Sequence, residues 1–124
     1  MNARWTSQDV ARTLNKARSR YGAKKVQIDG IWFDSKREGV RYVELRTMRA
    51  AGLITFLECH PKYRVGIKGI FICDVELDFA YWDCSQQQSV FEDVKSPGTN
   101  TALSKLKRKM VEAEYGIVIE LVGL

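Results

Sequence analysis

The spacing of apolar residues predicts a helix near the start of the chain. An apolar residue recurs every three or four positions, at Val10, Leu14, Ala17 and Tyr21. This repeat is typical of one helix face, which Gly22 ends. Four basic residues lie mostly off that face: Arg12, Lys16, Arg18 and Arg20. They form either a phosphate-binding arm or an ordinary solvated face, and the sequence leaves both interpretations open.

Turn and capping residues predict a hairpin followed by a second helix. Asp29-Gly30 interrupts the apolar segment 26–33, and this dipeptide between apolar residues favours the tight turn of a β-hairpin. Ser35 and Glu38 then have the spacing of a capping box. We therefore expect a helix that begins there and ends near Ala51.

The middle of the chain predicts strands. Residues 54–65 and residues 70–82 are rich in aromatic and β-branched side chains, so we expect one strand over each, the second of them long. Pro61 marks an edge or a bulge in the first. Residues 89–95 predict a partner for the long strand, because the polar segment 83–88 suits a hairpin loop.

The end of the chain predicts a third helix over 101–115 and a last, buried strand over 117–122. The apolar stripe of that helix is formed by Leu103, Leu106, Met110 and Ala113. The order of hairpin, helix, three strands, helix and strand predicts an α/β fold in one domain.

Composition narrows the class of protein. The chain has 124 residues and 45% hydrophobic residues, enough for one domain with a core. It lacks a run of about 18 apolar residues, so we expect no membrane span. The single histidine, His60, excludes a zinc site built on several histidines. Three cysteines without a CxxC pair indicate a reducing setting, and we expect a cytoplasmic protein.

Charge is unevenly distributed along the chain. The formal net charge of +5 suggests an anionic partner only weakly. Residues 1–25 carry a net charge of +6 and residues 95–109 one of +5, whereas residues 26–94 carry −3. Within that acidic part, residues 69–94 hold six carboxylates and no Lys or Arg. Two basic segments therefore flank an acidic centre.

Carboxylates in the acidic centre predict a metal site. Asp93 and Lys95 share a strand face because side chains two apart point the same way. Asp78 stands on the preceding strand, where an antiparallel pairing brings it across from Asp93, and Glu38 lies on a helix that must pack against the sheet. Converging carboxylates raise each other's pKa values, and Mg²⁺, with Mn²⁺ as a substitute, relieves this repulsion.

Other interpretations of these residues stay open. A D-x-K triplet such as Asp93-Val-Lys95 is by itself often an ordinary ion pair on a strand. Asp74 and Glu76 share a face with Asp78, and they are either extra ligands or a solvated strand face. The three cysteines are more typical of small core residues than of ligands.

The site residues occur in the order of a known nuclease motif. Glu on a helix, Asp on a strand and Asp-x-Lys on the next strand resemble the PD-(D/E)xK nuclease superfamily. Within it, the chain resembles small phage and prophage proteins related to phage endonuclease I and Holliday-junction resolvases. The segments that carry this resemblance are Phe33-Asp-Ser-Lys-Arg-Glu38, Ala51-Gly-Leu-Ile54, Pro61-Lys-Tyr63, Asp78-Phe79, Glu92-Asp-Val-Lys95 and Lys107-Arg-Lys109.

The resemblance implies a restriction-endonuclease-like core over residues 26–124, with a mixed central sheet flanked by helices, preceded by a basic arm over 1–25. It implies that Asp78 and Asp93 bind the metal and that Lys95 assists the attacking nucleophile. Glu38 would complete the site, directly or through water. Two positions depart from the pattern: Leu77 replaces a proline, and His60 stands where relatives often have glutamine. His60 either contacts phosphate or is a surface histidine.

The expected function is a magnesium-dependent endodeoxyribonuclease, which by analogy cuts branched or junction DNA and acts as a homodimer in the cytoplasm (that of the bacterial host if a phage encodes it). Basic side chains would contact the DNA backbone without reading its sequence; they are Arg12, Lys16, Arg20, Lys105, Lys107, Arg108 and Lys109. The alternative is a non-catalytic DNA-binding or assembly protein that keeps the fold. Cleavage of RNA instead of DNA stays open.

Overall fold

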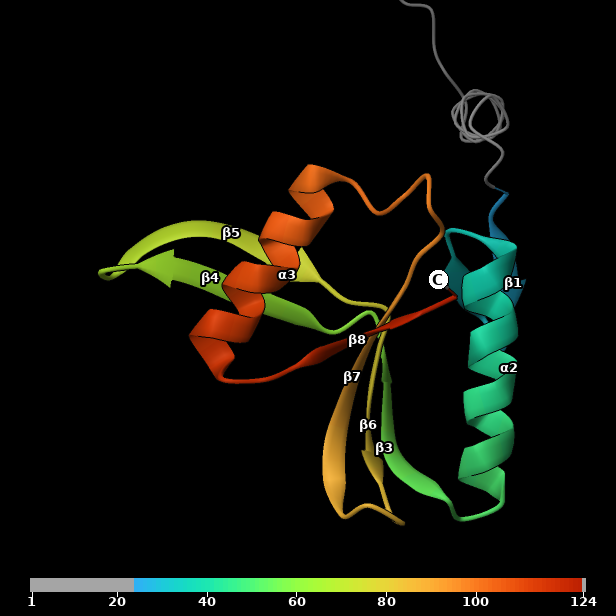
Figure 1. Cartoon of the computed structure of the whole chain (residues 1–124). Helices are drawn as coiled ribbons and strands as arrows, with labels where there is room; N and C mark the ends of the chain where they lie inside the picture. Colours follow the sequence, from blue (N-terminus) through green and yellow to red (C-terminus); the bar gives the residue numbers. More distant parts are fainter. Residues whose placement is uncertain (1–23, 124) are drawn as a thin grey trace, which may run out of the picture. The chain divides into compact units, whose positions relative to one another are not determined.

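The computed structural model describes residues 24–123, and these residues form two helices and eight strands (Figure 1). The chain comprises two compact units, Met1–Tyr42 and Val43–Leu124, and helix α2 runs through the boundary. The predicted first helix, which carries three of the basic residues expected to contact DNA (Arg12, Lys16 and Arg20), lies outside the described residues.

The first unit contains the predicted hairpin. Strands β1 (Val26–Ile28) and β2 (Ile31–Phe33) pair antiparallel. Asp29 and Gly30 form the turn with φ angles of 54° and 78°, the left-handed conformations that such a turn requires. The Tyr42 hydroxyl donates a hydrogen bond of 2.8 Å to Asp29 Oδ2, which ties the turn to α2. The hairpin prediction is confirmed.

The predicted capping box begins helix α2 (Lys36–Ala50). Ser35 Oγ accepts a hydrogen bond of 3.2 Å from the Glu38 N–H, and Glu38 Oε2 accepts one of 3.3 Å from the Ser35 hydroxyl. The other oxygen, Glu38 Oε1, accepts from the Asp34 N–H at 3.4 Å. Gly52 follows the helix with a φ of 78°, the conformation that commonly ends a helix. Both ends agree with the sequence.

The strands expected over 54–65 and 70–82 are each divided in two, so the prediction of continuous strands was wrong. They become four strands: β3 (Ile54–Cys59), β4 (Lys62–Ile67), β5 (Ile70–Glu76) and β6 (Phe79–Asp83). The pair β3–β6 joins one sheet and the pair β4–β5 forms another. Figure 1 shows the β4–β5 hairpin running in a different direction from β3 and β6.

The division has a local cause at His60-Pro61. His60 adopts a φ of 56°, outside the strand region, and Pro61 has no N–H to donate. Two backbone hydrogen bonds of 2.9 Å still link the two segments at the bend. The His60 N–H donates to Asp78 O, and the Leu77 N–H donates to Pro61 O. The two strand pairs are therefore one long ribbon with a sharp bend, and Asp78 lies at that bend.

The larger sheet has four strands in the order β3-β6-β7-β8, with β7 (Gln88–Val94) and β8 (Ile119–Val122) completing it. β6 and β7 pair antiparallel, whereas β7 and β8 pair parallel. The expected α/β fold with a mixed sheet is confirmed. β8 is an edge strand in which Ile119 alone is buried, so the expectation of a buried last strand was wrong.

Helix α3 (Ala102–Tyr115) forms where predicted, but it buries a different face. Leu103 and Leu106, expected in its apolar stripe, are 60% and 54% exposed, whereas Arg108 and Val111 are buried. Val111 packs in one hydrophobic core with Val65, Val75, Leu77 and Ile119. The helix packs against the β4–β5 hairpin and β8 with the face that carries Arg108 and Val111. Leu103 and Leu106 therefore stay on the exposed side.

Polar contacts fix this orientation. The Tyr115 hydroxyl donates a hydrogen bond of 2.7 Å to the carbonyl oxygen of Arg64 on β4. Glu114 Oε1 accepts one of 3.0 Å from the Gly66 N–H on the same strand. The end of α3 therefore occupies backbone groups on the outer edge of β4.

Candidate active site

Asp78 comes across from Asp93, as the sequence predicts, but it lies at the bend just before β6 and not within a strand, whereas Asp93 lies on β7. The register pairs Phe79 with Glu92, so the preceding residue, Asp78, comes opposite Asp93. Asp78 donates its N–H to Glu92 O at 3.2 Å. Its side-chain Oδ2 accepts a hydrogen bond of 2.6 Å from the Val94 N–H, which fixes the orientation of the carboxylate.

Glu92 points to the other face of the sheet, because neighbouring side chains on a strand alternate. Its side chain is 1% exposed, and Tyr81 donates a hydrogen bond of 2.5 Å to Glu92 Oε2. A buried carboxylate needs such partners because desolvation is costly. Glu92 is therefore a structural residue, separate from the face that carries Asp93.

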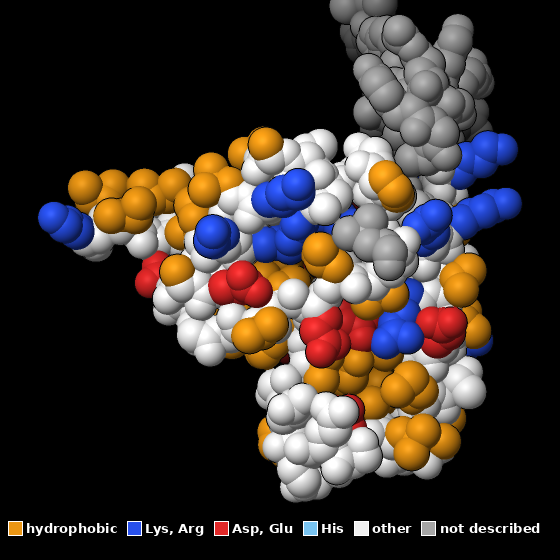
Figure 2. Space-filling model, in the orientation of Figure 1, with side chains coloured by type: hydrophobic (Ala, Val, Ile, Leu, Met, Phe, Trp, Pro, Cys, Tyr) orange, Lys and Arg blue, Asp and Glu red, His pale blue; other side chains and the backbone are white. Residues whose placement is uncertain are grey.

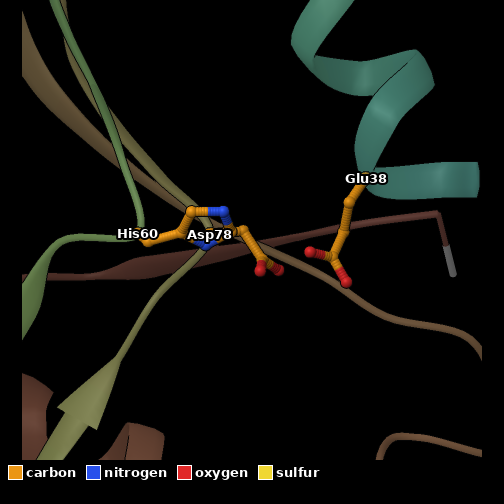
Figure 3. A group of neighbouring side chains, drawn as sticks. All are labelled: Glu38, His60 and Asp78. Carbon is orange, nitrogen blue, oxygen red and sulfur yellow. The ribbon is translucent and has the colours of Figure 1, made fainter. Parts of the chain in front are cut away.

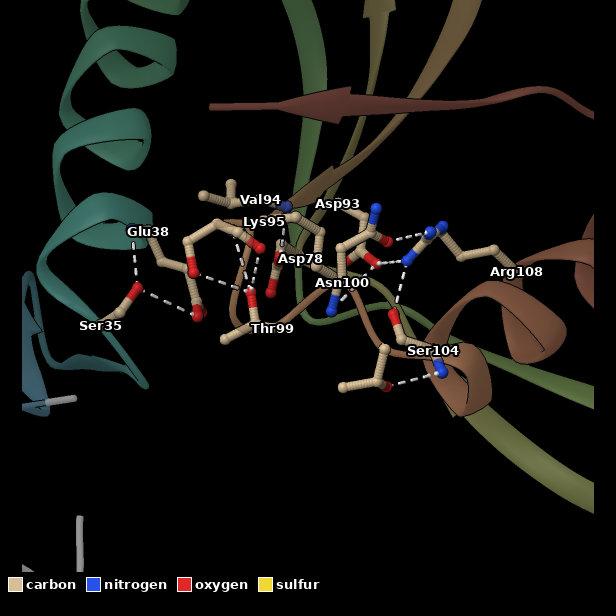
Figure 4. A network of polar contacts seen from close by, with 12 residues as sticks. Ser35, Glu38, Asp78, Asp93, Val94, Lys95, Thr99, Asn100, Ser104 and Arg108 are labelled. Atoms are coloured by element: carbon tan, nitrogen blue, oxygen red, sulfur yellow. Dashed lines mark hydrogen bonds and ion pairs between the residues drawn. The ribbon is translucent and has the colours of Figure 1, made fainter. Parts of the chain in front are cut away.

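Asp93 sits between two cations, as Figure 4 shows. The Lys95 Nζ lies 3.4 Å from Asp93 Oδ2, and Arg108 Nη1 lies 3.6 Å from the same oxygen. The side chains of all three residues are less than one-fifth exposed. The structure thus brings Asp78, Asp93 and Lys95 to one place, and it adds Arg108.

Arg108, expected from the sequence to contact the DNA backbone, is instead buried. Its guanidinium also donates hydrogen bonds to Ser104 Oγ at 2.5 Å and to Asn100 Oδ1 at 2.6 Å (Figure 4). A side chain held by three partners is anchored inside the protein. The sequence contained one signal of this, because Ser104, Arg108 and Val111 follow the i, i+4, i+7 spacing of a single helix face.

The lysines of α3 differ from Arg108. Lys105 and Lys109 are exposed and Lys107 is half-buried. Figure 2 shows Lys and Arg side chains gathered on the surface over this region. These lysines are therefore accessible to an anionic partner, whereas Arg108 forms an ion pair with Asp93.

His60 lies near Asp78 at the bend of the ribbon (Figure 3). A ring nitrogen of His60 and a carboxylate oxygen of Asp78 lie within 4.8 Å of each other. Nδ1 of His60 is also 3.4 Å from Glu76 Oε1. Asp74 instead lies 3.6 Å from Arg64 on the exposed side of the β4–β5 hairpin. Of the two additional acids considered from the sequence, Glu76 therefore contacts His60, which lies near Asp78. Asp74 pairs with the exposed Arg64 instead.

Glu38 belongs to the first compact unit, where it projects from the first turn of α2 (Figure 3). Its carboxylate is engaged by Ser35 and by the Asp34 N–H. Its part in a site with Asp78 stays a prediction from the sequence.

The three cysteines are free thiols. Burial raises the pKa of Cys59, although the nearby Arg49 works in the opposite direction. A raised pKa disfavours the thiolate, the form that attacks or binds metals. The raised pKa therefore disfavours Cys59 as a nucleophile or a metal ligand.

Neither helix in the described range could cross a membrane. α2 has 15 residues and α3 has 14, whereas a spanning helix needs about 20 apolar residues.

Comparison with known proteins yields one match. No curated protein and no solved structure is similar to the chain. A family model described as "Protein of unknown function (DUF1064)" matches residues 18–121, which is most of the sequence and includes Glu38, Asp78, Asp93 and Lys95. The chain therefore belongs to the DUF1064 family.

Proposed function

We propose that this protein is a metal-dependent endodeoxyribonuclease that hydrolyses phosphodiester bonds, with branched or junction DNA as its substrate. One observation carries the proposal: Asp78, directly before β6, comes opposite Asp93 on β7, and Lys95 Nζ lies 3.4 Å from the Asp93 carboxylate. The four-stranded mixed sheet also has the form that the resemblance to PD-(D/E)xK nucleases implies.

The donor set fits a hard divalent cation. Asp78 and Asp93 offer carboxylate oxygens, which Mg²⁺ and Mn²⁺ prefer, and we assign Glu38 as a third carboxylate that acts directly or through water. When bound, the ion would polarise a phosphoryl oxygen and lower the pKa of a coordinated water. Asp93 would offer the oxygen that Lys95 and Arg108 do not contact, or it would exchange one of these cations for the ion.

Two residues of the chain then have separate roles in the reaction. Asp78, held by the Val94 N–H, presents its carboxylate in a fixed direction. Lys95 positions the attacking water or stabilises negative charge on the phosphate. The water oxygen forms a bond to phosphorus as the bond to the leaving oxygen breaks, and that oxygen takes up a proton.

DNA would be held by its phosphates. Lys105 and Lys109 are exposed on α3, and contacts of such lysines with the backbone are independent of sequence and sensitive to salt. We place the protein in the cytoplasm and propose a homodimer, because cutting both strands of DNA needs two sites.

A cleavage assay tests the proposal. Purified protein is incubated with Mg²⁺ or Mn²⁺ and with linear, supercoiled and four-way-junction DNA. We expect cleavage that EDTA stops and that falls at least a hundredfold in Lys95→Ala, the lower end of typical acid–base contributions. Lys109→Ala, an exposed lysine on α3, should keep its cleavage rate at saturating DNA. Absence of cleavage on every substrate would rule the proposal out.

A non-catalytic DNA-binding protein is the second candidate, and one observation favours it. The Asp93 carboxylate already has two cationic partners, Lys95 and Arg108, so its charge is compensated without a metal. This candidate predicts that Asp78→Ala and Lys95→Ala bind DNA like the wild type in an electrophoretic mobility assay, and that no variant cleaves. Parallel reactions with RNA of the same shape distinguish the two nucleic acids.

A further inference from the structure

Arg108 is a fixed positive charge beside Asp93. Besides its ion pair of 3.6 Å with Asp93 Oδ2, its guanidinium donates hydrogen bonds of 2.6 Å to Asn100 Oδ1 and of 2.5 Å to Ser104 Oγ (Figure 4). These partners anchor the side chain from the loop before α3 and from α3 itself. A guanidinium also stays protonated in proteins, so Arg108 can neither lose its charge nor leave the carboxylate without breaking these contacts.

The charges at the candidate site of the second compact unit balance without a metal. Asp78 and Asp93 carry two formal negative charges there, and Lys95 and Arg108 carry two positive ones. The side chains of Asp93 and Arg108 are at most one-tenth exposed, so salt screens their charges less than it screens charges at the surface. A divalent cation that binds the two carboxylates therefore joins a cluster without net charge, and the nearby guanidinium repels it.

DNA would supply the missing negative charge. Arg108 lies on α3, the helix that also carries the exposed Lys105 and Lys109, and the proposed function places DNA phosphates at these lysines. Phosphates are negatively charged, so they offset the guanidinium and reduce its repulsion of the cation. Coupling of this kind is reciprocal, because two ligands that favour each other's binding do so by the same factor.

We infer that Arg108 is a counter-ion of Asp93 that weakens the binding of a divalent cation to the free protein and couples it to the binding of DNA. The protein then acquires its ion together with its substrate. The inference rests on the proposed function, in which Asp78 and Asp93 hold the ion. A purely structural role of Arg108 predicts the reverse, because a loosened Asp93 carboxylate would bind the cation less tightly.

Calorimetric titration of the free protein with Ca²⁺, which takes carboxylate oxygens as Mg²⁺ does, tests the role of the charge. We expect Arg108→Gln to bind Ca²⁺ about tenfold more tightly than the wild type, a factor typical of coupled sites. Arg108→Lys keeps the positive charge and should bind like the wild type. Lys68→Gln is the matched control, since it removes the same charge from the exposed β4–β5 turn, and it should also bind like the wild type. Circular dichroism melting checks that each variant is folded.

The same titration with saturating four-way-junction DNA, shown on a gel to stay intact, tests the coupling. The wild type should bind Ca²⁺ about tenfold more tightly with DNA than without it, and Arg108→Gln should gain less. Equal Ca²⁺ affinity of the wild type with and without DNA would overturn the inference, and this comparison needs no variant. An Arg108→Gln variant that binds Ca²⁺ no more tightly than the wild type would overturn it too.

Failure of the inference and failure of the proposed function give different results. A wild type that cleaves DNA with Mg²⁺ but shows no coupling overturns the inference alone. A wild type that binds no Ca²⁺ in either state and cleaves no DNA overturns the proposed function as well.

Discussion

The guanidinium of Arg108 lies 3.6 Å from the carboxylate of Asp93, and both side chains are at most one-tenth exposed. Helix α3 is therefore joined through an ion pair to strand β7, which Lys95 directly follows. Removing one partner of a buried ion pair commonly costs about 3–5 kcal/mol. Because Lys95 stays beside Asp93 when Arg108 is removed, we expect the lower end of that range.

We predict that Arg108→Ala lowers the free energy of unfolding by about 3 kcal/mol, as measured by urea denaturation. Lys105→Ala, an exposed lysine on the same helix, should change it by less than about 0.5 kcal/mol. Equal effects of the two substitutions would show that the Arg108 contacts with Asp93, Asn100 and Ser104 contribute nothing to stability.

Metal binding should stabilise the fold through Asp78. A ligand that binds only the folded state at about 100 times its Kd adds about 2.7 kcal/mol to stability. We expect Mn²⁺ to raise the melting temperature of the wild type and to leave that of Asp78→Asn unchanged. Asp74→Asn removes a carboxylate that pairs with Arg64 on the exposed side of the hairpin, and it should respond like the wild type. A full Mn²⁺ response in Asp78→Asn would exclude Asp78 as a ligand.

The hairpin loop after β6 should make stability depend on pH. Hydrogen bonds from the Ser85 hydroxyl and from the backbone of Gln86 and Ser85 lower the pKa of Asp83. A carboxyl whose pKa is lower in the folded state stabilises the fold above its unfolded pKa, and the contribution is lost as pH falls through the folded pKa. Asp83→Asn should therefore be less stable than the wild type at neutral pH, with the difference shrinking in acid.

Urea denaturation of the wild type and Asp83→Asn at about pH 7 and about pH 2 measures this difference. A difference that stays constant between the two pH values would show that the ionised Asp83 side chain does not stabilise the loop.

Two glycines should differ in how much stability an alanine substitution costs. A Cβ on Gly66 would lie 2.9 Å from the carbonyl oxygen of Ile70, whereas a Cβ on Gly98 would meet nothing within 4 Å. Because the clash at Gly66 is with backbone, we expect Gly66→Ala to lower the free energy of unfolding by about 1–3 kcal/mol. Gly98→Ala should change it by less than about 0.5 kcal/mol. A neutral Gly66→Ala would mean that the β4–β5 hairpin can widen freely.

Local chemistry determined much of the fold. The turn at Asp29-Gly30 and the capping box of Ser35 and Glu38 depend on residues close together in sequence, so the sequence predicted both. The opposition of Asp78 and Asp93 also followed from sequence, because a hairpin between neighbouring strands and the two-residue alternation of side chains suffice to derive it. These are short-range rules with few alternatives.

Only the tertiary structure decided what depends on packing between distant segments. The bend at His60-Pro61 arises because the ribbon leaves one sheet and forms another, which strand propensity alone does not reveal. Leu103 and Leu106 looked like the buried stripe of α3, yet the helix turns Arg108 and Val111 inward, where a carboxylate and a core from other strands receive them. A helical repeat shows which residues share a face, but the neighbouring elements decide which face is buried.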